Sequence, residues 1–97
     1  MLTSKQRAYL RKLAHNMEAI MQIGKQGASP ETAAAIDEAL EARELIKISV
    51  LNNCPQDPHE AAEILCKNAR AQCIQVIGKK IVMYRKNHDK SMINLPK

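Results

Sequence analysis

Three helix-start signals divide this sequence, and they constrain its fold more than any other feature. Thr3 and Gln6 form a T-x-x-Q capping box, while Ser29 and Asp57 each stand directly before a proline. Short oxygen-bearing side chains cap the unpaired N–H groups of a first helical turn, and proline fits the first helical position. We therefore expect three helices, each of which begins directly after one of the capping residues Thr3, Ser29 and Asp57.

Four short runs rich in strand-forming residues lie between and after these signals, at residues 19–23, 45–51, 73–77 and 80–85. The second run alternates apolar and polar residues, as a half-buried strand does. Gly78-Lys79 separates the last two runs, and a two-residue link that begins with glycine is typical of a type II′ hairpin. The order α-β-α-β-α-β-β predicts an α/β fold, a two-layer domain in which helices pack against a mixed four-stranded sheet.

Length and composition fit one folded domain, since the chain has 97 residues of which 45% are hydrophobic. We place this domain at residues 1–86 and expect residues 87–97, which are polar and basic, to form a flexible tail. No apolar run approaches the roughly 18 residues of a membrane helix, and the first residues carry no secretory signal, so we expect a cytoplasmic location. The three cysteines show no CxxC spacing, so we expect reduced thiols, no metal site and no cofactor.

The segment Gly24-Lys25-Gln26-Gly27 is a GxxG loop between an expected strand and an expected helix. Two glycines leave the backbone bare, so that a sugar-phosphate chain can come close, and the next helix start offers N–H groups and a positive dipole end. Lys25 would add a charge-assisted phosphate contact, and Gln26 a hydrogen bond to a phosphate or a 2′-hydroxyl. The loop alone equally allows a structural β-α turn that merely needs glycine.

The charge of the chain is polarised along the sequence. The formal net charge is +5, both ends are basic, and the segment from residue 31 to residue 63 is acidic. If the basic ends meet in the fold, they form a patch suited to phosphates; otherwise they are a solvated surface. The candidates for contact with a nucleic-acid backbone are Lys5, Arg7, Arg11, Lys12, Lys79, Lys80 and Arg85.

The residue inventory disfavours two other classes of protein. Tyr9 and Tyr84 are the only aromatic residues, whereas RRM and OB folds stack bases on aromatic rings of the sheet. The sequence contains no GxxxxGK[ST] phosphate loop and no recognisable nucleophile elbow. We therefore expect neither a base-stacking sheet nor an enzyme.

Three segments together resemble the CRM domain family, to which bacterial YhbY-like RNA-binding proteins belong. They are Ile23–Gly27 with the GxxG loop, Arg43–Ile48 at the second strand and Val76–Arg85 at the closing hairpin, in family order and at roughly family spacing. The resemblance spans residues 2–86 and implies a fold like the C-terminal domain of translation initiation factor 3. It also implies an RNA-binding module that associates with precursors of the large ribosomal subunit. One departure is Arg70, where the family usually has glycine near the end of the third helix.

These observations lead to the hypothesis of an RNA-binding protein that holds the RNA backbone with its GxxG loop and basic surface. The resemblance implies that it assists ribosome assembly, with large-subunit ribosomal RNA and the precursor particle as partners. We expect no membrane partner and no small-molecule substrate. The alternative is a protein-binding adaptor on the ribosome that acts through the acidic helices.

Overall fold

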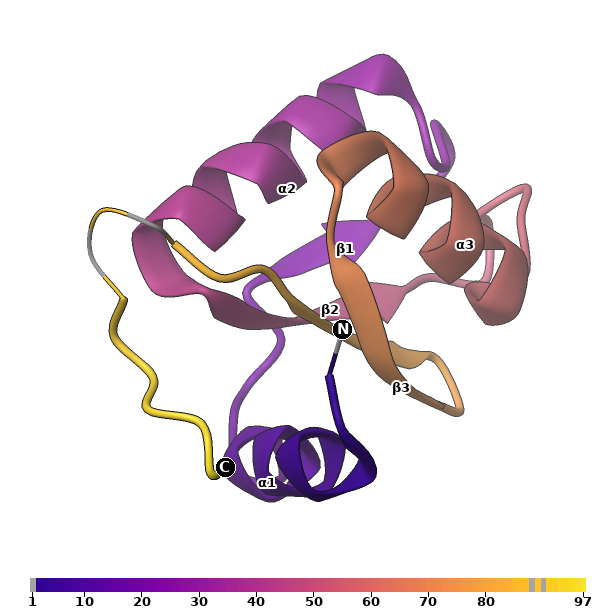
Figure 1. The fold of residues 1–97 in the computed structure, drawn as a ribbon. Coiled ribbons are helices and arrows are strands. Elements are labelled where there is room, and N and C mark those ends of the chain that lie inside the picture. Colours follow the sequence, from indigo (N-terminus) through magenta and orange to yellow (C-terminus); the bar gives the residue numbers. More distant parts are fainter. Residues whose placement is uncertain (1, 88, 90) are drawn as a thin grey trace.

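The helices and strands of the computed structural model follow the order that the sequence predicts (Figure 1). The structure describes residues 2–87, 89 and 91–97. The strands form one sheet in the order β1-β2-β4-β3, in which β1 and β2 are parallel and the other neighbouring pairs are antiparallel. The predicted mixed four-stranded sheet is therefore confirmed. The elements are α1 (Ser4–Ala14), β1 (Met21–Ile23), α2 (Pro30–Arg43), β2 (Leu45–Val50), α3 (Pro58–Ala69), β3 (Gln72–Ile77) and β4 (Lys80–Tyr84).

Side-chain caps fix the residue at which each helix begins. Gln6 N–H donates to Thr3 Oγ1 at 3.1 Å, and Thr3 N–H donates to Gln6 Oε1 at 2.9 Å. Asp57 and Glu60 make the same reciprocal pair of bonds. The hydroxyl of Ser29 accepts an N–H group of the first turn of α2. These bonds satisfy backbone groups that a helix leaves unpaired at its start, so the three predicted helix starts are confirmed.

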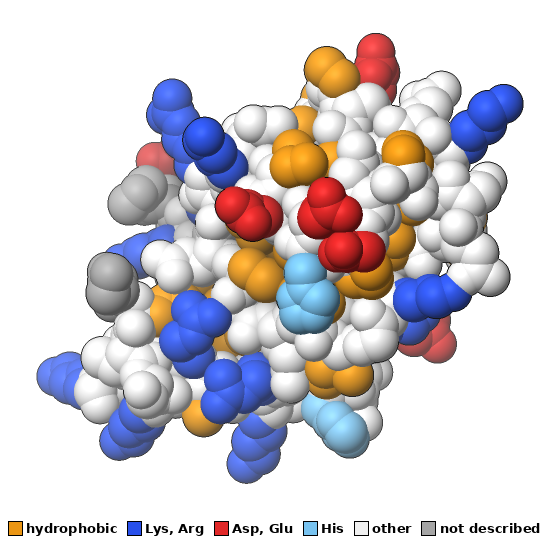
Figure 2. Space-filling view, turned by 90° about the vertical axis from the view of Figure 1, so that its right-hand side faces the viewer, with side chains coloured by type: hydrophobic (Ala, Val, Ile, Leu, Met, Phe, Trp, Pro, Cys, Tyr) orange, Lys and Arg blue, Asp and Glu red, His pale blue; other side chains and the backbone are white. Residues whose placement is uncertain are grey.

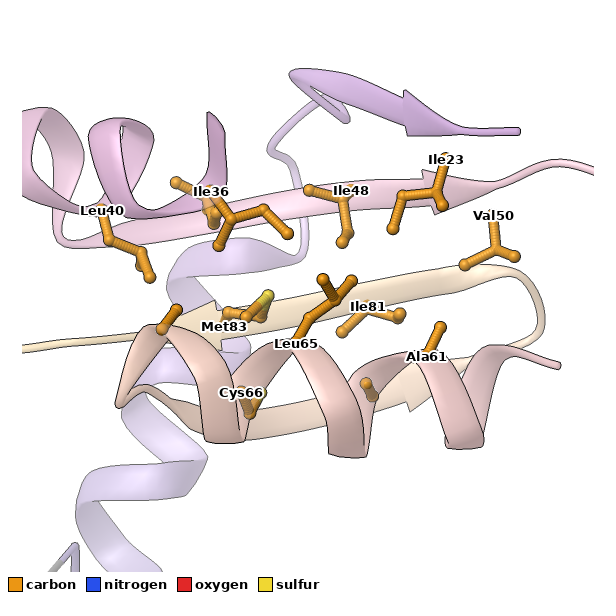
Figure 3. Close-up of a cluster of buried hydrophobic side chains, with 13 residues drawn as sticks. Ile23, Ile36, Leu40, Ile48, Val50, Ala61, Leu65, Cys66, Ile81 and Met83 are labelled. Atoms are coloured by element: carbon orange, nitrogen blue, oxygen red, sulfur yellow. The ribbon is translucent and has the colours of Figure 1, made fainter. Parts of the chain in front are cut away.

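The main core lies between the sheet and the helices α2 and α3 (Figure 3). Ile36 and Leu40 come from α2, and Leu65 points from α3 toward the strands. The strand residues on this face are spaced two apart because side chains alternate along a strand. They are Ile23, Ile46, Ile48, Val50, Ile81 and Met83.

Helix α1 packs on the opposite face of the sheet and adds a third layer to the two that the sequence predicts (Figure 1). Leu10 and Ala14 of α1 are buried in a second cluster of side chains. Its strand members include Leu45 of β2, and Val82 and Tyr84 of β4, which face away from the main core. Strands β2 and β4 are therefore buried on both sides, which explains why neither face of β4 is purely polar in sequence.

The β3–β4 hairpin turns at Gly78 and Lys79, as predicted. Gly78 has a φ of +55°, whereas Lys79 does not have a positive φ, and this is the pattern of a type II′ turn. Near the start of β3, the register shifts between Cys73 and Gln75, which marks a β-bulge.

The segment after β4 runs back toward α1 (Figure 1), and hydrogen bonds to Glu44 hold it. Glu44 is fully buried at the end of α2, with a φ of +63°. Its carboxylate accepts the backbone N–H groups of Asn87, Met92 and Ile93. The side chain of Ile93 also packs against the α1 cluster. The flexibility expected for the tail stays a prediction, and these contacts argue against it.

Candidate nucleic-acid interface

One end of the sheet brings the GxxG loop and the β3–β4 turn to either side of the end of β2. Leu51 N–H donates to Ile23 O at 2.8 Å and ties the residue after β2 to the strand that enters the GxxG loop. On the other side, Val50 N–H donates to Lys79 O at 2.7 Å. Segments that are distant in sequence thus converge here. We call this edge the loop end of the sheet; it consists of residues 24–27, 51–56 and 78–80.

The GxxG loop is a tight turn that presents two polar side chains. Gly27 N–H donates to Gly24 O at 2.9 Å, so Lys25 and Gln26 occupy the two central positions of a β-turn. Both of these side chains are exposed. A phosphate that approaches the turn therefore meets an ammonium group and an amide first.

Gly27 is required by the fold itself. Its φ of +62° lies in the region that side chains disfavour. A Cβ atom there would lie 2.3 Å from Gln56 Oε1 and 2.8 Å from Pro55 Cγ. The Gln56 oxygen is held in place because it accepts Ala28 N–H at 3.0 Å. The structural reason for a glycine in a β-α turn thus accounts for Gly27.

Gly24 has no such structural requirement. Its φ is not positive, and a Cβ atom would meet Asn53 Oδ1 at 3.4 Å and Leu51 Cδ1 at 3.5 Å. These are ordinary contact distances, so the fold leaves room for a methyl group. Close approach of a ligand to the bare backbone is another physical reason for glycine at such a position.

The first turn of α2 offers fewer free N–H donors to a phosphate than the sequence suggests. Pro30 has no N–H group, and Thr32 N–H donates to Ser29 Oγ at 3.2 Å. Glu31 adds an exposed carboxylate in the same turn. The positive end of the helix dipole remains, but the donors that the structure leaves open to an anion here are mainly the exposed side chains of Lys25 and Gln26.

Lysines of β2 and of the hairpin extend the positive surface toward α1. Lys79 is exposed at the turn, and Lys80 Nζ donates to Ser49 Oγ at 2.5 Å. Lys47 of β2 lines a cavity of about 140 Å³ together with Lys80 and His15. Lys47 was not among the sequence candidates. The alternating pattern of β2, which turns Lys47 away from the main core, was a signal that could have found it.

The cations of α1 fall into two groups. Arg11 and Lys12 lie in the half of α1 nearer to the loop end and line an open groove of about 570 Å³ with Ile77. Lys5 and Arg7 lie in the other half, where Arg7 Nη2 donates to a backbone oxygen near the start of β3 at 2.6 Å. The two basic ends of the chain therefore meet in the fold, but Lys5 and Arg7 lie away from the loop end.

Arg85 lies at the opposite end of β4 and is bound internally. It is about 17 Å along the strand from Lys80, at the usual rise of a β-strand. Its guanidinium donates to Asp37 Oδ1 at 2.6 Å and to Glu41 Oε1 at 3.3 Å, and its side chain is 18% exposed. It also donates to Ala69 O at 2.7 Å. Because Arg85 joins α2, α3 and β4, we assign it to the structure of the domain and leave it out of the interface.

Acidic and basic side chains are unevenly distributed over the surface. On the face shown in Figure 2, the larger group of Lys and Arg side chains lies in the lower half, at the height of α1 in Figure 1. Three acidic side chains gather above this group, and further cations lie at the upper edges. The acidic residues of the middle segment belong mainly to α2 and α3. A phosphate is therefore attracted to the α1 side of the loop end more than to the side of α2 and α3.

The described residues contain neither a metal-type cluster nor a membrane-type helix. Within residues 2–87, 89 and 91–97, no three side chains of His, Cys, Asp or Glu come together in a way that could hold a metal ion. In the same part of the chain, no helix combines the length and the apolar character needed to cross a membrane.

Known proteins resemble this chain over nearly its whole length. The family model for the CRS1 / YhbY (CRM) domain matches residues 2–85. A Bacillus subtilis protein named "Probable RNA-binding protein YqeI" is 48% identical over 96 residues, which cover 99% of this chain and 100% of the relative. A Haemophilus influenzae protein named "RNA-binding protein" is 29% identical, over 99% of this chain and 96% of the relative. The solution structure of the hypothetical protein SAV1595 from Staphylococcus aureus has a TM-score of 0.82 and 49% identity, covering 99% of this chain and 100% of that one.

Proposed function

The chain belongs to the CRS1/YhbY (CRM) domain family, and on this premise we propose that it binds structured RNA at the loop end of its sheet. The names of the two relatives above support RNA as the partner and a role without catalysis. The observation that supports the site most directly is the convergence of the GxxG turn and the hairpin turn at the end of β2. Both turns present exposed lysines there.

In this proposal the GxxG turn holds one stretch of RNA backbone. The bare backbone at Gly24 lets a sugar-phosphate unit approach closely. Lys25 then makes a charge-assisted phosphate contact, and Gln26 donates to a phosphate or a 2′-hydroxyl. KH domains use a GxxG loop on another fold to clamp about four nucleotides.

The α1 side of the loop end extends the contact along the RNA. Lys47 and Lys80 line one cavity, and Lys79 precedes Lys80 at the exposed turn. Arg11 and Lys12 continue this surface onto α1. Contacts of this type position the RNA without reading its sequence. Each neutralised phosphate releases counterions, so about five contacts would make the affinity fall by orders of magnitude as the salt concentration rises.

The RNA that we propose is large-subunit ribosomal RNA in a precursor particle in the cytoplasm, whose assembly the protein assists. This finer proposal is supported by the resemblance of Ile23–Gly27, Arg43–Ile48 and Val76–Arg85 to the family. Crosslinking in cells followed by RNA sequencing tests it. We expect enrichment of large-subunit ribosomal RNA, and enrichment of messenger RNA alone would contradict the proposal.

The adaptor role remains the second hypothesis, but some of the acidic side chains that it would need already pair with a cation of the same domain. Asp37 and Glu41 of α2 form ion pairs with Arg85, so these acids are partly neutralised. Treatment of purified particles with ribonuclease separates the two roles. RNA binding predicts release of the protein, whereas retention on the remaining ribosomal protein would favour the adaptor.

Charge reversal at Lys25 tests the site. The variant Lys25→Glu should bind a structured RNA about tenfold more weakly and should show a smaller salt slope, because one phosphate contact becomes a repulsion. The side chain is exposed in a turn, so the circular dichroism spectrum and the melting temperature should not change. Fluorescence anisotropy with a labelled RNA hairpin, repeated at several salt concentrations, measures both effects.

Lys67→Glu is the matched control for this variant. Lys67 is exposed in the last turn of α3, far from the loop end, and its reversal changes the net charge by the same amount. We expect only a long-range effect of about twofold. Equal losses in the two variants would mean that total charge governs binding, and binding that does not respond to salt would sink the electrostatic mechanism.

A further inference from the structure

Cys66 and Cys73 meet at the junction between α3 and β3, away from the proposed RNA interface. Cys66 lies in the last turn of α3, on the side that overlies the hairpin (Figure 3). Cys73 lies in β3 and packs against the core cluster that contains Cys66. The chain reverses between them, with Ala71 N–H donating to Cys66 O at 2.8 Å. This reversal brings Cys66 and Cys73 to the same part of the core, where the interaction of the two thiols shifts the pKa of each.

We propose that Cys66 and Cys73 form a reversible oxidation site for small hydroperoxides, in which Cys73 reacts first and Cys66 closes a disulfide with it. The pair joins thiols from two successive elements that pack in one cluster, and the guanidinium of Arg7 is bonded to the backbone of one of the two residues. Nothing in the RNA-binding role requires this arrangement, so the proposal stands independently of that role.

The two thiols differ in a way that assigns their roles. Cys66 is only 8% exposed, whereas Cys73 is half-buried and can be reached by a small reagent. The hydrogen bond from Cys66 and the positive charge of Arg7 lower the pKa of Cys73 to about 7, although burial opposes the shift. The hydrogen bond to Cys73 and burial raise the pKa of Cys66. At neutral pH, Cys73 therefore supplies the thiolate and Cys66 keeps its proton.

The position of Arg7 supports this assignment by geometry. Arg7 Nη2 donates to the backbone oxygen of Cys73 at 2.6 Å, which fixes a positive charge at the backbone of Cys73, while the Cys73 side chain packs against the main core. Arg7 was a sequence candidate for RNA contact but lies far from the loop end. In this proposal Arg7 acts on Cys73, to whose backbone it is bonded, and not on RNA.

The oxidation proceeds in two steps. The Cys73 thiolate attacks one oxygen of the hydroperoxide, the O–O bond breaks, and the second oxygen leaves as water or an alcohol after taking a proton from solvent. Cys73 is then a sulfenic acid. The Cys66 sulfur attacks the Cys73 sulfur, the S–O bond breaks, and the departing hydroxide takes the Cys66 proton and leaves as water. The two thiols lose two electrons, and the peroxide gains them.

The reaction can be tested on the unmodified protein, because Cys54 serves as an internal control. Cys54 lies before α3, where its thiol donates to Gln56 Oε1 at 3.7 Å. In competitive alkylation at neutral pH, followed by peptide mass spectrometry, Cys73 should react at least about fivefold faster than Cys54. Hydrogen peroxide should then produce an intramolecular Cys66–Cys73 disulfide that thiol reductants reverse. Equal alkylation of Cys54 and Cys73, or a disulfide that includes Cys54, would overturn the proposal.

Cysteine variants separate the two steps. Cys66→Ala should stop oxidation at the sulfenic acid of Cys73, which dimedone traps, whereas Cys73→Ala should abolish both dimedone labelling and the disulfide. Cys54→Ala should behave like the unmodified protein. Arg7→Gln, which leaves all three thiols in place, should slow alkylation of Cys73 by about twofold or more. The absence of a dimedone adduct in Cys66→Ala would overturn the proposal, and an unchanged rate in Arg7→Gln would overturn the part assigned to Arg7.

Discussion

Two residues at helix ends hold a backbone conformation that side chains disfavour. Glu44 follows α2 with a φ of +63°, and Arg70 follows α3 with a φ of +55°. Such conformations cost of order 1–3 kcal/mol and persist where the surroundings compensate. Glu44 is compensated by three N–H groups that bond to its buried carboxylate. Arg70 is exposed, and the bonds that it makes at this position come from its backbone N–H group, which glycine would keep.

Replacement of Arg70 by glycine should therefore stabilise the domain. We expect Arg70→Gly to raise the free energy of unfolding by about 1 kcal/mol, because glycine adopts the left-handed region without the penalty that a Cβ atom imposes. Urea denaturation at neutral pH measures the change. Arg70→Ala is the control, since it removes the same side chain but keeps the Cβ atom. An equal gain in both variants would trace the effect to the arginine side chain and not to φ.

Glu44→Gln should destabilise the domain by about 2 kcal/mol. The amide replaces one acceptor oxygen with a donor, which must face a backbone N–H of the tail in a buried site. Urea denaturation gives the loss, and amide hydrogen exchange should show faster exchange at Asn87 and Ile93. An unchanged stability together with unchanged exchange would mean that these bonds are not formed in solution.

Tyr84 gives a second readout of the same variant. Burial and the negative charge of Glu44 both raise the pKa of Tyr84, so removal of that charge should bring the pKa back toward its ordinary value. A spectrophotometric titration detects this change, with the unmodified protein as the reference. A Tyr84 that titrates as before in Glu44→Gln would show that burial alone causes the shift.

At the scale of elements, the GxxG loop and residues 51–56 form one unit, and its two glycines should respond differently to substitution. Gly27→Ala should cost about 2 kcal/mol or more, because the methyl group would collide with Gln56 and Pro55 at a positive φ. Gly24→Ala should change stability by less than about 0.5 kcal/mol, because its methyl group meets only ordinary contacts. Thermal and urea denaturation of both variants measure this difference.

The same pair distinguishes a structural glycine from a binding glycine. If RNA approaches the backbone at Gly24, Gly24→Ala should weaken RNA binding by about tenfold while the protein stays folded. RNA affinity that is unchanged in Gly24→Ala would place the close approach elsewhere on the loop end. Gly27→Ala is compared only under conditions where circular dichroism shows that it is folded.

Sequence reasoning succeeded where the deciding interactions are local. The caps at Thr3, Ser29 and Asp57 depend on residues three positions away, and the turn at Gly78 depends on two residues. These local features predict the order of the helices and strands along the chain, and from that order a mixed four-stranded sheet. The GxxG loop was likewise placed correctly between β1 and α2, because its neighbours on both sides carry local signals.

Sequence reasoning fell short where partners are distant in the chain. Arg85 was expected to face RNA, yet its acidic partners lie on α2, more than 40 residues earlier. Lys47 was overlooked because its proximity to Lys80 follows from the pairing of β2 with β4. Both faces of β4 carry apolar residues, because one face covers the main core and α1 packs on the other. Such facts depend on tertiary packing, which local patterns do not encode.

At the scale of the whole molecule, the three layers separate the basic surface from the acidic one. Helix α1 contributes cations on one face of the sheet, and α2 and α3 contribute most of the acids on the other. The described part of the tail joins these layers, since Glu44 at the end of α2 holds it and Ile93 and Leu95 pack against the cluster around α1. The tail should therefore matter for stability more than its composition suggests.

Truncation after Lys86 tests this role of the tail. Removal of residues 87–97 takes away the three N–H groups that bond to Glu44 and the packing of Ile93 and Leu95. We expect the free energy of unfolding to fall by about 2–3 kcal/mol, because solvation of the freed carboxylate offsets only part of the loss. Urea denaturation measures the change, and RNA affinity should stay the same because the loop end lies at the other end of β4.

A shorter truncation after Leu95 supplies the control, because among the described contacts it removes the bond from Gln6 Nε2 to Pro96 O at 3.0 Å and keeps those of Glu44. We expect this variant to lose less than about 0.5 kcal/mol. If the tail is flexible, as its composition predicts, both truncations will leave the stability unchanged, and the domain ends near residue 86. If only the longer truncation is destabilised, the bonds of the tail to Glu44 and the packing of Ile93 and Leu95 are part of the fold. The domain then extends to about residue 95.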